Sequence, residues 1–322
     1  MVSWPTTPLL LPATDSDDSA DEGATAFVYE HFRHRPSVVQ FWSELQQVVL
    51  KADLIRYLAM LARGGVYSDM DTSCLVAIDD WIPADLRNET INAVIGIEYD
   101  DTTYRMFVRP ISFNQWTLMA KPGHTLFDTA VRRVMSNLEY IARRKRVLMR
   151  DLKLDKMEVL EATGPGMITD AVMEVLRDQV ENIRWETFHR MKKPRIFGDV
   201  LILPVRAFAG GQKHSHSSDK AYGPALVQHH FGRSWYKHQA ALLAPEANRT
   251  AVEEAGEPTS EHVALVVAEH EGGEETEQEQ GEMAEVVIES TTVTVEGDDG
   301  DPDSMADAHA GSALGEDIPA DA

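Results

Sequence analysis

The chain has one cysteine and no long apolar segment. Because Cys74 is the single thiol in 322 residues, no disulfide can form within the chain. No run of about 18 apolar residues is present, so the sequence predicts no transmembrane helix. The N-terminus also lacks the basic segment and apolar stretch that are typical of a signal peptide. We interpret Cys74 as a buried packing residue, since no histidine stands at a spacing that suggests a nucleophilic pair.

Basic residues are almost absent from the last quarter of the chain. The formal net charge is −23, but from Pro245 onward 23 acidic residues accompany one basic residue, Arg249. This segment therefore carries −22, and the preceding 244 residues carry −1. A composition this acidic buries too little apolar surface to offset chain entropy, so we expect a disordered tail over 244–322. Neither part has the basic excess expected of a nucleic-acid-binding protein.

Residues 51–72 form the most informative segment of the sequence, which reads KADLIRYLAMLARGGVYSDMDT. Its first half has apolar residues at helical spacing and predicts a helix with one buried stripe. Asp53 and Arg56 are three residues apart, so they are neighbours on the surface of this helix. An ordinary surface ion pair would give the same spacing, and that alternative stays open.

Two glycines separate this helix from a pair of aspartates. Gly64 and Gly65 tolerate the left-handed backbone that ends a helix. The next segment, 66–71, predicts a strand, and alternation of side chains then places Asp69 and Asp71 on one face. Two such carboxylates repel each other unless a cation lies beside them. A solvated turn is the plain alternative for an isolated Asp-x-Asp sequence.

The ordered combination of these features favours a metal site that holds a nucleotide diphosphate. Oxygen ligands of this kind favour Mn²⁺ or Mg²⁺ over zinc. A divalent ion neutralises a diphosphate and stabilises it as a leaving group. The segment therefore predicts a transferase that takes a sugar from a nucleotide-sugar donor.

This segment closely resembles the DXD sugar-binding region of glycosyltransferase family 32, and within it the group of fungal initiation-specific alpha-1,6-mannosyltransferases. Three later segments are similar to motifs of the same family and follow in the same order. They are Asn-Gln-Trp-Thr at 114–117 with Lys-Pro-Gly-His at 121–124, Thr-Gly-Pro at 163–165 with Thr-Asp at 169–170, and Gln-His-His-Phe at 228–231 with Ser-Trp at 234–235.

The resemblance implies a GT-A fold, which is a Rossmann-like α/β fold, and a metal-dependent transferase that retains the anomeric configuration. It implies GDP-mannose as the donor, the core of an N-linked glycan as the acceptor, and Mn²⁺ or Mg²⁺ as the cofactor. It also implies a location in the Golgi, with membrane association only through an anchor upstream of this chain.

The same resemblance assigns roles to individual residues. Asp53 and Arg56 match the pair that contacts the donor sugar, and Asp69 matches the first aspartate of the motif, near the ribose and the metal. Asp71 matches a direct metal ligand, and His229 matches the histidine near the metal and diphosphate. Residues implied to lie near the substrates are Gln115, Gly164, Pro165, Asp170 and His230, the last being the alternative to His229.

Two features depart from the family pattern. An opening strand that reads approximately Pro-Lys-Ile-Ile-His-Gln is not found, so we expect the first strand–helix unit of the fold to be lacking. Arg233 also interrupts the C-terminal Gly-Ser-Trp motif. A truncated or non-catalytic glycosyltransferase-like protein is therefore an alternative. A second alternative is a phosphohydrolase similar to haloacid dehalogenases, because residues 69–71 resemble the nucleophile loop of that family.

The remaining pattern predicts three parts: an irregular segment at 1–26, a glycosyltransferase domain at 27–243, and the acidic tail at 244–322. Within the domain, apolar periodicity predicts helices and strands. Helices are expected at 38–62, 125–150 and 169–179, and strands at 91–98, 107–113 and 200–208.

Overall fold

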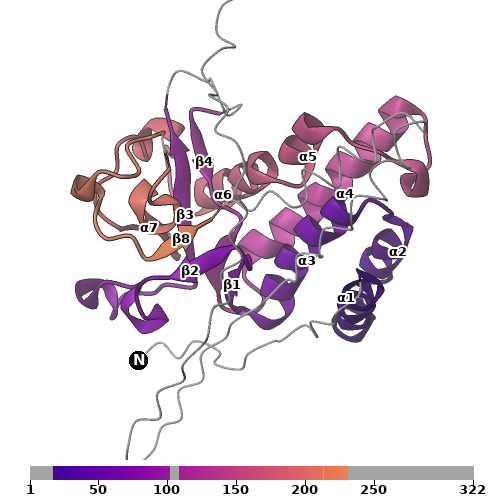
Figure 1. Ribbon diagram of the computed structural model, residues 1–322, viewed down its shortest axis with the longest axis horizontal. Helices are drawn as coiled ribbons and strands as arrows, with labels where there is room; N and C mark the ends of the chain where they lie inside the picture. Colours follow the sequence, from indigo (N-terminus) through magenta and orange to yellow (C-terminus); the bar gives the residue numbers. More distant parts are fainter. Residues whose placement is uncertain (1–16, 102–108, 213, 231–322) are drawn as a thin grey trace, which may run out of the picture. The chain divides into compact units, whose positions relative to one another are not determined.

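The computed structural model describes residues 17–101, 109–212 and 214–230, which form a mixed α/β structure (Figure 1). This confirms the predicted α/β class. The acidic tail expected at 244–322 lies outside the described residues, as do residues 1–16 of the expected N-terminal segment.

One sheet organises the described residues. Its strands follow the order β1-β5-β3-β7-β6, with β4 paired to β3 at the end of β3. The pair β3–β7 is parallel, and the other pairs are antiparallel. A separate two-stranded sheet joins β2 to β8. The strands are β1 Gly65–Ser68, β2 Thr72–Cys74, β3 Ala93–Asp100, β4 Ile111–Phe113, β5 Thr117–Ala120, β6 Arg195–Phe197, β7 Val200–Leu203 and β8 Val227–His229.

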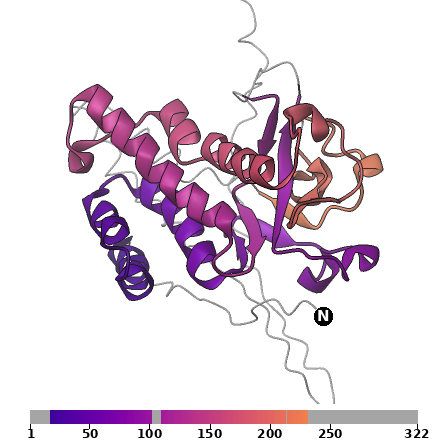
Figure 2. The same ribbon diagram turned by 180° about the vertical axis from the view of Figure 1, so that it is seen from behind.

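Helices cover both faces of the sheet (Figures 1 and 2). On one face, α3 packs beside α4 and α4 beside α6, while α1 and α2 lie outside α3. On the other face, α7 packs against β3. The helices are α1 Asp17–Phe32, α2 Pro36–Glu44, α3 Val48–Arg63, α4 Thr125–Lys145, α5 Lys156–Ala162, α6 Pro165–Gln179 and α7 Val205–Ala209.

Each face of the sheet has its own apolar core. The larger core joins α3, α4 and α6 to side chains such as Ile95 and Leu118, both fully buried. The smaller core joins Val94 and Leu201 to Phe208 of α7. Because successive residues of a strand point to opposite faces, Val94 and Ile95 lie in different cores, and β3 is buried on both sides.

Several boundaries differ from those predicted. Residues 17–26 are helical instead of irregular, and the second half of the helix is packed into the core through the buried Phe27 and Phe32. The strand expected at 200–208 ends at Leu203. Pro204, which has no backbone N–H for the sheet, begins the turn into α7.

Two helices are also shifted relative to the prediction. Helix α4 ends at Lys145 instead of Arg150, because Arg146 adopts the left-handed conformation, with φ of 58°. Helix α6 begins at Pro165, one turn before the expected Thr169, since proline is well suited to the first position of a helix. None of the helices among residues 17–101, 109–212 and 214–230 combines the length and apolar character that crossing a membrane requires.

The turn from α3 into β1 depends on the absence of a side chain at Gly64. This residue has φ of 62° and ψ of −151°, a conformation reached almost only by glycine. A Cβ atom there would lie 2.5 Å from the backbone nitrogen of Pro122, which is too close for any real contact. Gly123 also has a positive φ, of 74°, but a Cβ atom would meet nothing within 4 Å.

We therefore expect Gly64→Ala to lower the free energy of unfolding by about 3 kcal/mol or more, from backbone strain and the clash together. Gly123→Ala is the matched control and should cost about 1 kcal/mol, from strain alone. Urea unfolding followed by circular dichroism measures both. Equal losses in the two variants would show that the close approach of residues 120–122 does not restrict this turn.

Candidate functional site

Helix α3 buries an ion pair between Asp53 and Arg56. The two residues are 3% and 8% exposed, so most of each charge is removed from water. A charge this deeply buried is stable only when it is paired and hydrogen-bonded. The Nη1 of Arg56 donates a hydrogen bond to Oδ1 of Asp53. The pair predicted from the spacing is therefore a buried one and not an ordinary surface ion pair.

The same guanidinium extends to the aspartate pair beyond β1. Its Nε lies 3.0 Å from Oδ1 of Asp69, and its Nη2 lies 3.2 Å from Oδ2. Nε also lies 3.0 Å from the hydroxyl of Tyr67, which donates to Asp69 at 2.5 Å. Burial acts to lower the pKa of Arg56, but Asp69, Tyr67 and Asp53 raise it well above its ordinary value. Arg56 is thus a fixed cation between two carboxylates.

Asp53 also connects α3 to the start of α6. The hydroxyl of Thr163 donates to Oδ2 of Asp53 at 2.5 Å. Burial raises the pKa of Asp53, while Arg56 and the Thr163 hydroxyl act to lower it. The hydroxyl of Tyr57 lies 2.7 Å from Oε1 of Gln115 and 2.8 Å from the carbonyl oxygen of Thr163. Asp53 therefore has its orientation fixed from two sides.

The structure corrects the placement of Asp69 and Asp71 on a strand. Strand β1 ends at Ser68, and the two aspartates lie in the turn that leads into β2. The turn is closed by Thr72, whose hydroxyl donates to the carbonyl oxygen of Asp69 at 2.6 Å and contacts the hydroxyl of Ser68 at 2.7 Å. Such local bonds compete with continued strand pairing.

The small sheet of β2 and β8 brings a histidine to these aspartates. Thr72 pairs with His229, and the backbone N–H of His230 donates to the carbonyl oxygen of Asp71 at 2.7 Å. The Nε2 of His229 lies 3.3 Å from Oδ1 of Asp71. One ligand atom from each of Asp69, Asp71 and His229 lies within 4.8 Å of the others. The turn and the distant strand thus form one cluster with the residue types of a divalent-metal site.

The surroundings of His229 favour the neutral form that binds metals. Burial lowers its pKa, and the nearby Asp71 and Asp69 oppose this shift. Its ring lies 4.8 Å from the ring of Trp116, measured between centroids. His230, the alternative, lies outside the cluster, since its Nε2 contacts the hydroxyl of Ser73 at 2.7 Å.

The other residues implied by the resemblance lie between β4 and β5, or at the cap and in the first half of α6. Gln115 contacts Tyr57, as described above, while Gly164 precedes α6 and Pro165 is its first residue. Asp170 lies farther along α6, where its carboxylate forms an ion pair with Arg109 at 2.8 Å. Asp170 is therefore not in the cluster of Asp69, Asp71 and His229.

Three residues of the site were not predicted to have a role: Tyr57, Tyr67 and Thr163. Signals for two of them were present in the sequence. Tyr67 stands two residues before Asp69, and Thr163 opens the Thr-Gly-Pro segment. Tyr57 stands among the apolar residues at helical spacing, and that pattern predicts burial without a further role.

The interpretation of Cys74 as a buried packing residue is wrong. The residue is exposed, and its thiol contacts the carbonyl oxygen of Val76 at 3.0 Å. It lies at the end of β2, a strand of a sheet with only two strands, where little is available to cover it.

Comparison with known proteins identifies the region that contains these residues. Residues 16–87 match the family described as "Glycosyltransferase sugar-binding region containing DXD motif". This match includes Asp53, Arg56, Asp69 and Asp71. The chain therefore carries a glycosyltransferase sugar-binding region.

Curated relatives extend the similarity. An "Initiation-specific alpha-1,6-mannosyltransferase" of Schizosaccharomyces pombe is 37% identical over 220 residues, which cover 67% of this chain and 54% of the relative. A "Putative glycosyltransferase HOC1" of Saccharomyces cerevisiae is 30% identical, over 57% of this chain and 48% of the relative. An "Initiation-specific alpha-1,6-mannosyltransferase" of Candida albicans is 29% identical, over 67% of this chain and 61% of the relative.

The chain thus spans about half the length of the first two relatives and 61% of the third. These matches confirm the predicted resemblance to fungal mannosyltransferases.

The buried ion pair predicts how stability responds to the loss of Arg56. Arg56→Met leaves Asp53 buried without its cation, which should lower the free energy of unfolding by about 3 kcal/mol or more. Burial raises the pKa of Asp53 in the folded state. The free-energy cost of burying its unpaired carboxylate is therefore absent while Asp53 is protonated, and it appears as the pH rises through the folded-state pKa. The loss of unfolding free energy in Arg56→Met should therefore become smaller as the pH is lowered from neutral toward the ordinary pKa of an aspartate.

Urea unfolding at several pH values measures this deficit. Arg63→Met is the matched control, since Arg63 lies in the last turn of the same helix and is only partly buried. A deficit that is the same in both variants, or one that grows as the pH falls, would contradict the account.

Proposed function

We propose that this chain, which carries a glycosyltransferase sugar-binding region, is a metal-dependent glycosyltransferase that moves a sugar from a nucleotide-sugar donor to a glycan. The observation that carries the proposal is the guanidinium of Arg56. It joins Asp53, the residue matched to the donor sugar, to Asp69 of the aspartate pair. One hydrogen-bonded cluster thus contains the groups suited to the sugar and to the diphosphate.

A GT-A fold forms part of this proposal. It is supported by the parallel pair β3–β7 within a sheet that helices cover on both faces. In sheets of this kind, ligands bind near the carboxyl ends of the strands. The aspartate pair directly follows β1, which is consistent with that location.

The residues present fit a divalent cation. Asp53, Asp69 and Asp71 carry three negative charges, and Arg56 carries one positive charge. One divalent ion neutralises the net charge of −2 that results. Because the set includes an imidazole, Mn²⁺ suits it better than Mg²⁺, which prefers oxygen ligands in a strict octahedron. Asp71 and His229 would hold the ion, and Asp69 would contact both the ion and the ribose. A bound ion would neutralise the departing diphosphate.

The protein groups position the donor. Asp69 is held by Arg56 and Tyr67, which leaves its remaining oxygen lone pairs for the ion and the ribose. Asp53 and Arg56 offer an acceptor and a donor of hydrogen bonds to sugar hydroxyls. An acceptor hydroxyl would then attack the anomeric carbon on the side that the diphosphate leaves, with retention of configuration. We assign no catalytic nucleophile.

The identity of the substrates rests on similarity to the named relatives. Relatives called initiation-specific alpha-1,6-mannosyltransferases support GDP-mannose as the donor and the core of an N-linked glycan as the acceptor. A location in the Golgi belongs to the same proposal.

A phosphohydrolase is supported less well. Both oxygens of Asp69 accept hydrogen bonds from the guanidinium of Arg56, which lowers the nucleophilicity that such an enzyme would need from this carboxylate. The strand that leads into it, β1, pairs antiparallel with β5, at the edge of the sheet.

Release of GDP from GDP-mannose, with and without Mn²⁺, tests the proposed function. Asp71→Asn should reduce metal-dependent release by about a hundredfold or more, because a metal supplies several kcal/mol of transition-state stabilisation. Asp79→Asn is the matched control, since Asp79 is an exposed aspartate of the loop after β2, and it should leave release unchanged.

The non-catalytic alternative makes the opposite prediction. No release of GDP from any nucleotide sugar, combined with no calorimetric binding of GDP in the presence of Mn²⁺, would refute the proposed function.

A further inference from the structure

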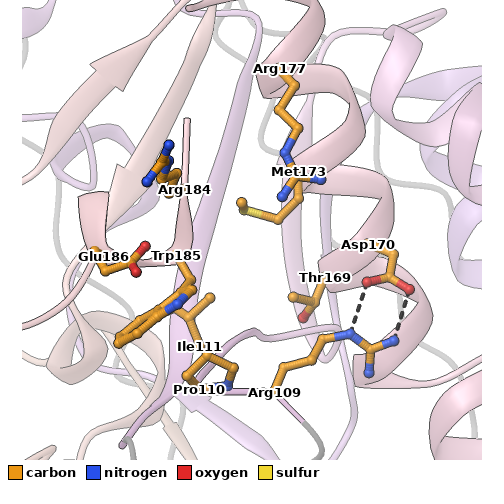
Figure 3. Close-up of a pocket in the computed structure, with 10 residues that line it drawn as sticks. All are labelled: Arg109, Pro110, Ile111, Thr169, Asp170, Met173, Arg177, Arg184, Trp185 and Glu186. Carbon is orange, nitrogen blue, oxygen red and sulfur yellow. Dashed lines mark hydrogen bonds and ion pairs between the residues drawn. The ribbon is translucent and has the colours of Figure 1, made fainter. Parts of the chain in front are cut away.

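A pocket lies beside α6 and contains none of the residues assigned to the metal or the donor sugar (Figure 3). Its volume is about 410 Å³, within the usual range for a small-molecule site. Figure 3 shows Arg109 and Asp170 on one side of the pocket and Arg184, Trp185 and Glu186 on the other. The chemistry of these walls indicates what the pocket binds.

Trp185 supplies a flat apolar wall that remains partly exposed. The residue lies in a short 3-10 helix, Trp185–Thr187, and its ring meets the ring of His189 edge-on at 5.7 Å. His189 is itself held by Asp100, whose Oδ1 lies 2.6 Å from its Nδ1. Met173 of α6 adds buried apolar surface nearby. An indole with one apolar face and one N–H donor suits the mixed surface of a pyranose ring.

The opposite wall is fixed before any ligand arrives. Arg109 donates to both oxygens of Asp170 at 2.8 Å, and its Nη1 lies 2.9 Å from Oε2 of Glu161. Burial acts to lower the pKa of Arg109, but these two carboxylates raise it. Because Glu161 belongs to α5 and Asp170 to α6, the bidentate contacts lock two helices and leave little conformational entropy to lose on binding.

The charged groups around the pocket are of both signs. Its lining contains three arginines, Arg109, Arg177 and Arg184, and two carboxylates, Asp170 and Glu186. Arg109 is already neutralised by Asp170 and by Glu161, a third carboxylate that lies outside the lining. The Nε of Arg177 donates to the carbonyl oxygen of Ile183 at 3.5 Å. Arg184 and Glu186 add one hydrogen-bond donor group and one acceptor group beside the apolar ring, which suits a ligand that carries many hydroxyls.

Helix α6 connects this pocket to the donor site. Thr163, which directly precedes the helix cap, contacts Asp53, while Thr169 lines the pocket. Because α6 begins at Pro165, Thr169 lies about 6 Å along the helix axis from its first residue. The pocket is thus about one helical turn from the end of α6 that follows Thr163, a separation that a ligand with several sugar units can span.

The geometry points to an acceptor subsite: this pocket holds a neutral sugar unit of the acceptor oligosaccharide, away from the hydroxyl that is glycosylated. The assignment rests on the proposed function for its biological ligand. It adds a second place of contact, so that the enzyme recognises a chain of sugars and not a single residue.

Direct binding of a neutral, mannose-rich N-glycan to the full chain, measured by calorimetry without donor, tests this assignment. We expect Trp185→Ala and Arg184→Gln each to weaken binding by about tenfold, which corresponds to about 1.4 kcal/mol. Tyr140→Ala is the matched control, because Tyr140 is an exposed aromatic residue of α4 that does not line the pocket, and it should bind as the parent does. Thermal unfolding confirms that each variant is folded, and Arg184 is exposed enough to be replaced without loss of packing.

Kinetics separate this proposal from the proposed function. The two pocket variants should raise the KM for the acceptor about tenfold, while metal-dependent release of GDP in the absence of acceptor stays unchanged. Unchanged glycan binding in both variants, no glycan binding by the parent chain, or preferential binding of a sugar phosphate would each overturn the subsite. Loss of GDP release in the parent chain would instead refute the proposed function and leave the glycan-binding result to decide the pocket.

Discussion

The guanidinium of Arg56 is the contact on which the rest of the site depends. It is buried in α3, yet it reaches Asp53 in its own helix and Asp69 beyond β1. Because burying any of these charges alone costs several kcal/mol, the three groups are stable only together. The contact therefore fixes the helix, the turn and, through Thr163, the start of α6 in one arrangement. The proposed metal cluster and the proposed sugar-binding pair share this support.

The part of the site that the sequence predicts is local. Asp53 and Arg56 lie one helical turn apart, and Gly64 sets the reversal that brings the chain back as β1, so the 22 residues from Lys51 to Thr72 contain most of the geometry. The α/β class and the central strand β3 are also predictable, because an apolar run buried on both faces is typical of such a strand. The residues around Asp69 form a turn instead of the predicted strand, because the hydroxyls of Ser68 and Thr72 close it with hydrogen bonds. The alternation of side chains along the sequence does not predict these bonds.

The remaining parts depend on contacts between distant residues. The resemblance left His229 and His230 as alternatives, and the register of β8 against β2 is what separates them. Asp170 belongs to the family-like Thr-Gly-Pro region, yet its partner Arg109 is 61 residues away, so only packing reveals that it lines a pocket away from the metal cluster. The two sites then have different characters. One has an excess of carboxylates that suits a divalent cation, and the other has hydrogen-bonding groups of both signs beside an indole, which we propose suit sugar hydroxyls.

The central claim is that Asp69, Asp71 and His229 hold one divalent cation. Pulsed electron paramagnetic resonance of bound Mn²⁺ tests it most directly, because a coordinated imidazole produces nitrogen hyperfine coupling. The account predicts one Mn²⁺ per chain with such a coupling, which is lost in His229→Ala and kept in His230→Ala. A spectrum without nitrogen coupling, or one in which the coupling depends on His230 instead, would contradict the account.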